Sequence, residues 1–118
     1  MDIQTKRVYA QASQQDGFRV LVDRVWPRGM TKEKVQADLW LKVGAPSKDL
    51  CKWFENDRTR WDDFKLRYYA ELDDQPEVVA GLLDQAGQAR LTLLFAARDE
   101  EYNQAVALKE YLLAHFKK

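Results

Sequence analysis

The chain has 118 residues, the length of one domain, and its nineteen Lys and Arg residues balance nineteen Asp and Glu residues. This balance excludes a strong overall field toward nucleic acid or anionic membrane. No apolar run approaches the ~20 residues that span a bilayer, and the N-terminus lacks a signal-peptide core, so we expect a cytoplasmic protein without membrane contact.

Charge is distributed unevenly along the chain. Residues 1–50 carry nine basic and six acidic side chains, whereas residues 51–118 carry ten and thirteen. Several arginines of the basic half surround residues 20–29, so local positive potential is expected there.

The side chains that usually hold metals and cofactors are scarce. The single Cys51 cannot form an internal disulfide, and with His115 as the lone histidine no Cys/His zinc cluster can form. Glycine-rich nucleotide loops, the His-Glu-x-x-His motif and the Gly-x-Ser-x-Gly motif are absent from the sequence. We therefore expect no metal and no cofactor.

The first part of the chain predicts two strands. Residues 3–9 are β-prone, and residues 18–25 form a stronger strand, apolar on both faces, that Pro27 stops. Fewer residues separate the two than the dozen that a parallel crossover usually needs, so a hairpin remains an alternative.

Helix caps mark the middle of the chain. Thr31 can cap a short helix through about residue 37, and Ser47 a second that ends near residue 54. Between them, residues 38–42 fit either a helix or an extended segment. Asp57 can cap the next helix, on which one stripe of core residues is expected. The stripe consists of Trp61, Phe64, Tyr68 and Leu72.

The second half predicts a helix from about residue 74 to Gly87, with Pro76 in its first turn. Residues 91–97 then form an almost wholly apolar strand, and residues 98–101 charge the first turn of a final helix that Lys117 and Lys118 end. This order predicts a single small layered α/β domain over residues 1–118, with a short, largely parallel sheet and helices packed on it.

A candidate site follows from this fold. If the two strong strands are parallel neighbours, their carboxyl ends bring charged side chains together beside helix N-termini, an arrangement that favours an anion. The candidate ligand-binding residues are Arg24, Trp26, Arg28, Gly29, Lys42, Arg98 and Asn103. Asp23 and Asp99 are the candidate acid/base residues. Each residue also has a structural interpretation, as a turn, an ion pair or a helix cap.

Several sequence segments resemble one bacterial family. They are Leu-Val-Asp-Arg-Val-Trp-Pro-Arg-Gly (21–29), Asp-Leu-Trp-Leu-Lys (38–42), Ala-Pro-Ser (45–47), Lys-Trp-Phe (52–54) and Leu-Leu-Phe-Ala-Ala-Arg-Asp-Glu-Glu (93–101). These segments are similar to the YeaO-like proteins, which belong to a larger family labelled as a domain of unknown function. The resemblance implies a small cytoplasmic α/β protein and coincides with the candidate site.

We therefore expect a pocket for a small phosphate- or carboxylate-bearing molecule, such as a nucleotide, with catalysis left open. The alternative is a nucleic-acid-associated or protein-binding module without catalysis. The sequence leaves the oligomeric state open.

Overall fold

A computed structural model describes residues 1–55 and 57–116, so the predicted helix end at Lys117 and Lys118 lies outside the described residues. The strands are β1 (Ile3–Arg7), β2 (Phe18–Leu21), β3 (Leu39–Trp40) and β4 (Leu91–Phe95). The helices are α1 (Lys32–Val35), α2 (Lys48–Phe54), α3 (Trp61–Asp73), α4 (Pro76–Ala86) and α5 (Gln104–His115). Single 3-10 turns span Gln14–Asp16 and Arg58–Arg60.

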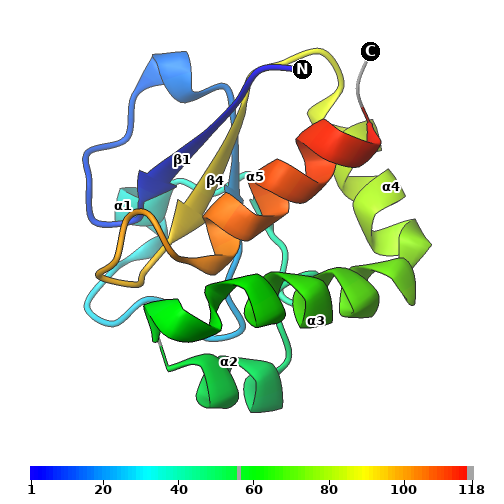
Figure 1. Cartoon of the computed structure of the whole chain (residues 1–118). Helices are drawn as coiled ribbons and strands as arrows, with labels where there is room; N and C mark the ends of the chain where they lie inside the picture. Colours follow the sequence, from blue (N-terminus) through cyan, green and yellow to red (C-terminus); the bar gives the residue numbers. More distant parts are fainter. Residues whose placement is uncertain (56, 117–118) are drawn as a thin grey trace.

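The four strands form one sheet in the order β1-β4-β2-β3, and every pair is parallel (Figure 1). The expected α/β class with a parallel sheet is confirmed. The hairpin alternative for β1 and β2 is wrong, because β4 lies between these strands and pairs with both. The short connection between them therefore crosses one intervening strand instead of folding back.

The two faces of the sheet have cores of different size. Val20 and Leu93 face a large core shared with α3, α4 and α5, whereas Leu21 and Leu94 face a small core closed by Val35 of α1. Figure 1 shows α5 crossing in front of the sheet and α1 behind it. Alternation along the central strands explains this division, since successive side chains of a strand point to opposite faces.

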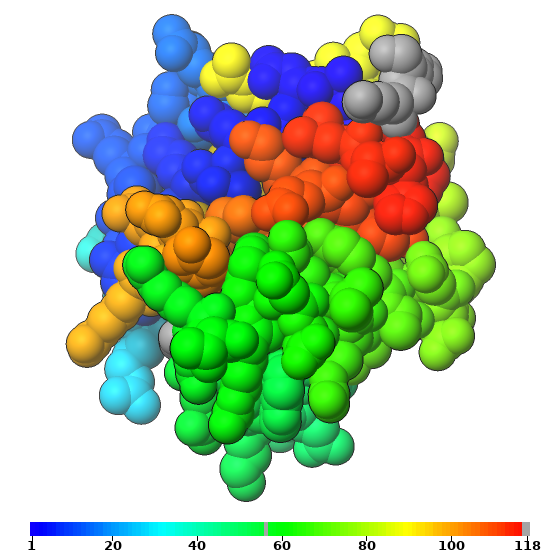
Figure 2. Space-filling view, in the orientation of Figure 1, coloured from blue at the N-terminus to red at the C-terminus, as the bar shows by residue number. Residues whose placement is uncertain are grey.

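The helices over the large core pack closely on one another. The hydroxyl of Tyr69 on α3 donates to the carbonyl of Ala107 on α5 at 2.8 Å, and Lys65 pairs with Glu110 at 3.0 Å. Figure 2 shows the side chains of α3 and α5 in contact across this face of the molecule. The predicted stripe on α3 is confirmed as core. Its four members, Trp61, Phe64, Tyr68 and Leu72, are all buried.

The predicted caps are confirmed at Thr31 and Ser47, whose side chains accept the N–H groups of Lys34 and Leu50. Asp57 caps a 3-10 turn that leads directly into α3, and α4 begins at Pro76 and ends before Gly87 as expected.

Several predicted boundaries are wrong. The strands predicted over residues 3–9 and 91–97 end at Arg7 and Phe95. The strand expected to reach residue 25 ends at Leu21, and Val25 is 64% exposed because the chain has already left the sheet. The final helix begins at Gln104 instead of near residue 98. Asp99 accepts the N–H groups of Glu101 and Tyr102 and so holds a turn ahead of the helix. The undecided residues 38–42 contain the extended pair β3.

Candidate ligand-binding site

The candidate site lies where β2 and β4 end. Phe18 to Leu21 pair in parallel with Leu91 to Leu94, and the N–H of Val22 extends the ladder to the carbonyl of Leu94 at 3.0 Å. The expectation that the two strong strands are neighbours is confirmed. The segments that follow them therefore leave the sheet at the same edge.

The predicted site residues separate into groups at this edge. Arg24, Trp26 and Lys42 line one cleft, while Asp23 lines a different pocket. The remaining candidates belong to the lining of neither cavity. They are Arg28, Gly29, Arg98, Asp99 and Asn103.

The cleft, which we call the tryptophan cleft, has a volume of about 460 Å³. It is lined by Arg24, Val25, Trp26, Trp40, Lys42 and Lys48. Three of these side chains are cationic and none is acidic. Within residues 1–55 and 57–116, no carboxylate forms a salt bridge with any of the three cations. The tryptophan cleft is therefore a region of uncompensated positive charge.

Backbone carbonyls hold Arg24 in place. Its Nε donates to the carbonyl of Pro46 at 2.8 Å and one Nη donates to the carbonyl of Ala45 at 3.2 Å. These neutral acceptors orient the guanidinium without cancelling its charge, which remains available to an anion. The backbone at Ala45 and Pro46 thus positions the side chain of Arg24, which follows the end of β2.

The two indoles form a fixed aromatic corner. Trp26 Nε1 donates to the carbonyl of Met30 at 2.7 Å, and Trp40 Nε1 donates to the carbonyl of Asp23 at 2.6 Å. Their rings meet edge to face with centroids 5.4 Å apart, and the ammonium of Lys42 lies 5.2 Å from the Trp40 ring centroid. Trp40 stays 37% exposed, so part of an anchored ring is open to a ligand.

The carboxyl group of Asp23 lies in a less polar setting. Burial raises its pKa above the ordinary value, although N–H groups of Arg24, Val25 and Ala96 act in the opposite direction. Oδ1 accepts the N–H of Arg24 at 3.1 Å, and Oδ2 lies 3.5 Å from Nε2 of Gln104.

A second cavity of about 240 Å³, which we call the Asp23 pocket, surrounds this carboxyl group. It is lined by Asp23, Cys51, Phe54, Glu55, Phe64, Ala97 and Gln104. Burial and the nearby Asp23 and Glu71 carboxylates raise the pKa of the Cys51 thiol to about 11, so this cysteine is not an activated nucleophile at neutral pH. Cys51 nevertheless lines the pocket.

Arg28 and Gly29 lie on an exposed turn. Gly29 has a φ of 77°, and the carbonyl of Arg28 accepts the hydroxyl of Tyr9 at 3.1 Å. The guanidinium of Arg7 lies over the Tyr9 ring at 5.1 Å, which brings the end of β1 beside this turn.

Asp99 and Asn103 hold the turn before α5. Burial opposes ionisation of Asp99, but the N–H groups of Glu101 and Tyr102 and the Arg58 guanidinium outweigh it and lower the pKa. The fully buried Asn103 accepts the N–H of Val106 and donates to the carbonyl of Asp99 at 2.8 Å. Arg98, beside them, is exposed.

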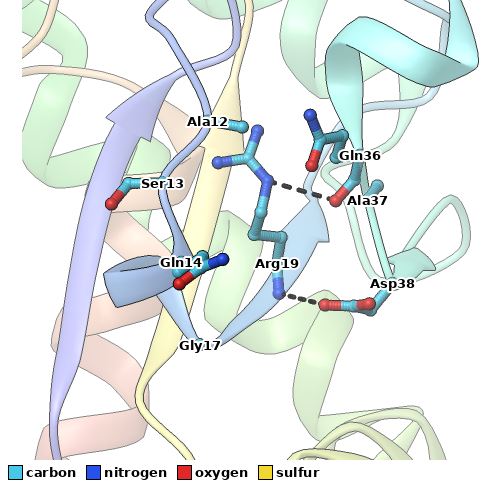
Figure 3. Close-up of a pocket in the computed structure, with 8 residues that line it drawn as sticks. All are labelled: Ala12, Ser13, Gln14, Gly17, Arg19, Gln36, Ala37 and Asp38. Carbon is cyan, nitrogen blue, oxygen red and sulfur yellow. Dashed lines mark hydrogen bonds between the residues drawn. The ribbon is translucent and has the colours of Figure 1, made fainter.

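A further cavity of about 430 Å³ lies at the opposite, amino end of β2 (Figure 3). Figure 3 shows Arg19 extended between Ala12 and Gln36, with its main-chain N–H directed at Asp38. The buried guanidinium donates to the carbonyls of Val35 and Gln36 and to the Asp16 carboxylate. These bonds use its donors internally, so the cavity is less suited to a ligand than the carboxyl edge.

Sequence reasoning missed most of the lining residues at this edge. Trp40 and Lys48 join the tryptophan cleft, and Cys51 and Gln104 join the Asp23 pocket. Trp40 and Lys48 could have been found from the sequence, because an indole and a cation lie on either side of residues 44–46. Cys51 and Gln104 could not, since only the packing of α2 and α5 against the sheet edge places them there.

Two general features are absent from the described part of the chain. No group of three or more His, Cys, Asp or Glu side chains there is arranged to hold a metal ion. Likewise, none of its helices combines the length and apolar character needed to cross a membrane.

The fold and the cleft define a small α/β protein with an all-parallel sheet and a cationic, tryptophan-lined cleft at the carboxyl edge. The chain belongs to the DUF488-N3i family, described as the inactive DUF488-N3 subclade, whose sequence model matches residues 2–118. The expected relation to YeaO-like proteins is also confirmed. The chain is 41% identical to "Uncharacterized protein YeaO" of Escherichia coli K12 over 112 residues, which cover 95% of this chain and 97% of the relative.

Mycobacterial relatives are also similar over nearly the full length. The chain is 36% identical over 110 residues to "Uncharacterized protein Rv3073c" of Mycobacterium tuberculosis H37Rv and to "Uncharacterized protein Mb3100c" of Mycobacterium bovis. These alignments cover 93% of this chain and 92% of each relative. No solved structure matches the chain.

Proposed function

We propose that the protein binds a small molecule that carries a phosphate or carboxylate group and a flat ring, as a nucleotide does, in the tryptophan cleft. The observation that carries this proposal is the meeting of three uncompensated cations, Arg24, Lys42 and Lys48, with two anchored indoles. Cations recognise the anionic group and the exposed face of Trp40 stacks on the ring.

A binding role is favoured over a catalytic one. The family to which the chain belongs is described as inactive, and Asp99 is occupied by Arg58 and by the turn before α5. Asp23 lies outside the lining of the tryptophan cleft. The proposal therefore gives neither carboxylate a step in a reaction.

Titration with AMP, followed by tryptophan fluorescence and by calorimetry, tests the proposal. AMP should bind more tightly than either adenosine or inorganic phosphate, because only AMP engages both the cations and the indoles. Lys42→Ala should weaken AMP binding about tenfold, the usual effect of losing one charge-assisted contact.

Lys32→Ala is the matched control, since Lys32 is exposed on α1 outside the cleft lining and its loss should leave the Kd for AMP unchanged. Equal effects of the two lysine substitutions would contradict the site. Tighter binding of a single-stranded oligonucleotide, with a steep dependence on salt, would instead favour the nucleic-acid alternative.

A further inference from the structure

We propose that the Asp23 pocket is a second binding site, opposite in charge to the tryptophan cleft, that takes the guanidinium group of a small molecule. Two side chains of its lining, Asp23 and Glu55, are acidic, and none is basic. The pocket therefore repels the anions that the tryptophan cleft attracts. Its volume of about 240 Å³ suits a group of a few heavy atoms.

The Asp23 carboxylate has capacity for a further donor. The N–H groups of Arg24, Val25 and Ala96 already act on this carboxylate, and Oδ1 accepts that of Arg24 at 3.1 Å. Nε2 of Gln104 lies 3.5 Å from Oδ2, beyond the usual hydrogen-bond distance. Because a carboxylate offers about four acceptor sites, this half-buried group can take one further donor, and it gains from an incoming cation that supplies it.

Gln104 adds a second acceptor. Its Nε2 donates to the carbonyl of Val22 at 3.0 Å, and no donor among the described residues pairs with Oε1. A guanidinium presents several N–H donors in one plane and can serve a carboxylate and an amide oxygen together, which a single point charge does less well.

Aromatic rings complete the pocket. Phe54 and Phe64 stack with centroids 4.3 Å apart, and both belong to the pocket lining. Because the two rings stack on each other, they give the pocket an apolar wall, which suits a guanidinium because that group is planar and weakly hydrated. Acceptors with aromatic rings beside them therefore select an organic cation over a fully hydrated metal ion.

Cys51 allows occupancy to be measured directly. It is the sole cysteine of the chain and lies in the pocket lining, so alkylation by iodoacetamide, followed by mass spectrometry, reports on one site. Methylguanidinium chloride is the probe, N-methylurea is its uncharged planar analogue, and sodium chloride at the same concentration controls for ionic strength. Protection is the ratio of alkylation rates without and with the probe, measured within each variant.

Methylguanidinium should protect Cys51 at millimolar concentration, as expected for so small a ligand, while N-methylurea and sodium chloride should not. Asp23→Asn should abolish protection and Glu55→Gln should reduce it several-fold. Asp63→Asn, which changes an exposed carboxylate of α3 outside the pocket, should leave it unchanged.

The inference is overturned if methylguanidinium fails to protect the wild-type protein, or if N-methylurea protects equally. It is also overturned if protection persists at the wild-type level in Glu55→Gln. Because Glu55 is exposed, this variant should fold, and it therefore decides the case if Asp23→Asn fails to fold. AMP binding to the tryptophan cleft is measured separately, so the failure of either site is distinguishable from that of the other.

Discussion

At the level of single residues, Asp16 is the least exposed acidic residue in the described part of the chain, at 2%, and closes the network beside β2. It accepts the Arg19 guanidinium, the Lys6 ammonium at 3.1 Å and the N–H of Ser13 at 3.0 Å. Burial would raise the pKa of this carboxyl group, but the hydrogen bonds from Ser13, Lys6 and Arg19 outweigh it and lower the pKa below 3.8.

This lowered pKa predicts acid sensitivity. Because the folded-state pKa lies below the unfolded value near 3.8, the stabilisation by Asp16 is fully present above that pH and is lost as the pH falls through the folded-state value. Asp16→Asn should reduce the free energy of unfolding at pH 7 by about 3–5 kcal/mol, the usual cost of breaking a buried ion pair. Denaturant midpoints measured from pH 7 to pH 2 check this.

The difference between wild type and Asp16→Asn should shrink as the pH falls below about 4, since the wild-type carboxylate then becomes neutral as well. Asp63→Asn, at an exposed position, should change the midpoint by less than about 0.5 kcal/mol. A difference for Asp16→Asn that stays constant down to pH 2 would show that the stabilisation does not come from the ionised carboxylate.

The role of Asp16 is not visible in the sequence, because Lys6 and Arg19 reach it only after β1 and β2 take their places beside β4. The site shows the same limit. Asp23 and Arg24 are adjacent in the chain, yet they line different cavities, and nothing before folding tells which neighbour each will meet.

At the level of elements, the buried face of a helix was predicted better than the end of a strand. Spacing alone identified the core stripe of α3, since apolar side chains three or four apart must share a face. The end of β2 was missed because Val22 and Val25 are equally β-prone, whereas only the N–H of Val22 pairs with the neighbouring strand, at the carbonyl of Leu94. A strand ends where its neighbours end, and that is a property of the sheet.

The α3 stripe gives a prediction with an internal control. Trp61 is 9% exposed and stacks on Phe64 with centroids 5.7 Å apart. Trp61→Ala should cost about 3–5 kcal/mol in the free energy of unfolding, the range for truncating a large buried aromatic residue. Leu66, on the same helix but 68% exposed, should lose less than about 0.5 kcal/mol on substitution by alanine.

Urea unfolding followed by circular dichroism measures both α3 variants. Similar midpoints for Trp61→Ala and Leu66→Ala would show that the ring is not part of the core. Loss of AMP binding in a Trp61→Ala protein of unchanged stability would instead assign Trp61 to a ligand surface.

At the level of the whole molecule, the last strand in sequence becomes the centre of the sheet. β4 pairs with β1 on one side and with β2 on the other, so it connects the first strand of the chain to the rest of the sheet. Its side chains contribute to both the large core and the small one. The class of this fold was predictable from alternating strands and helices. The place of β4 between β1 and β2 was not, because a wholly apolar strand fits any covered position in a sheet.

This topology predicts how local stability is distributed. The amides of β4 are hydrogen-bonded between two neighbours, and its five side chains are all buried, so they should exchange with solvent only when the whole protein unfolds. β3 has two residues and pairs in the sheet only with β2, and the four residues of α1 close the small core from outside. Amides there should exchange faster by local opening.

Native-state hydrogen exchange read by NMR, with urea added in small steps, separates the two behaviours. Exchange from β4 should respond to urea as strongly as global unfolding does, whereas exchange from β3 and α1 should hardly respond. Equal urea dependence in β3 and β4 would mean that the sheet opens as one unit, and that the edge beside the tryptophan cleft is as rigid as the centre.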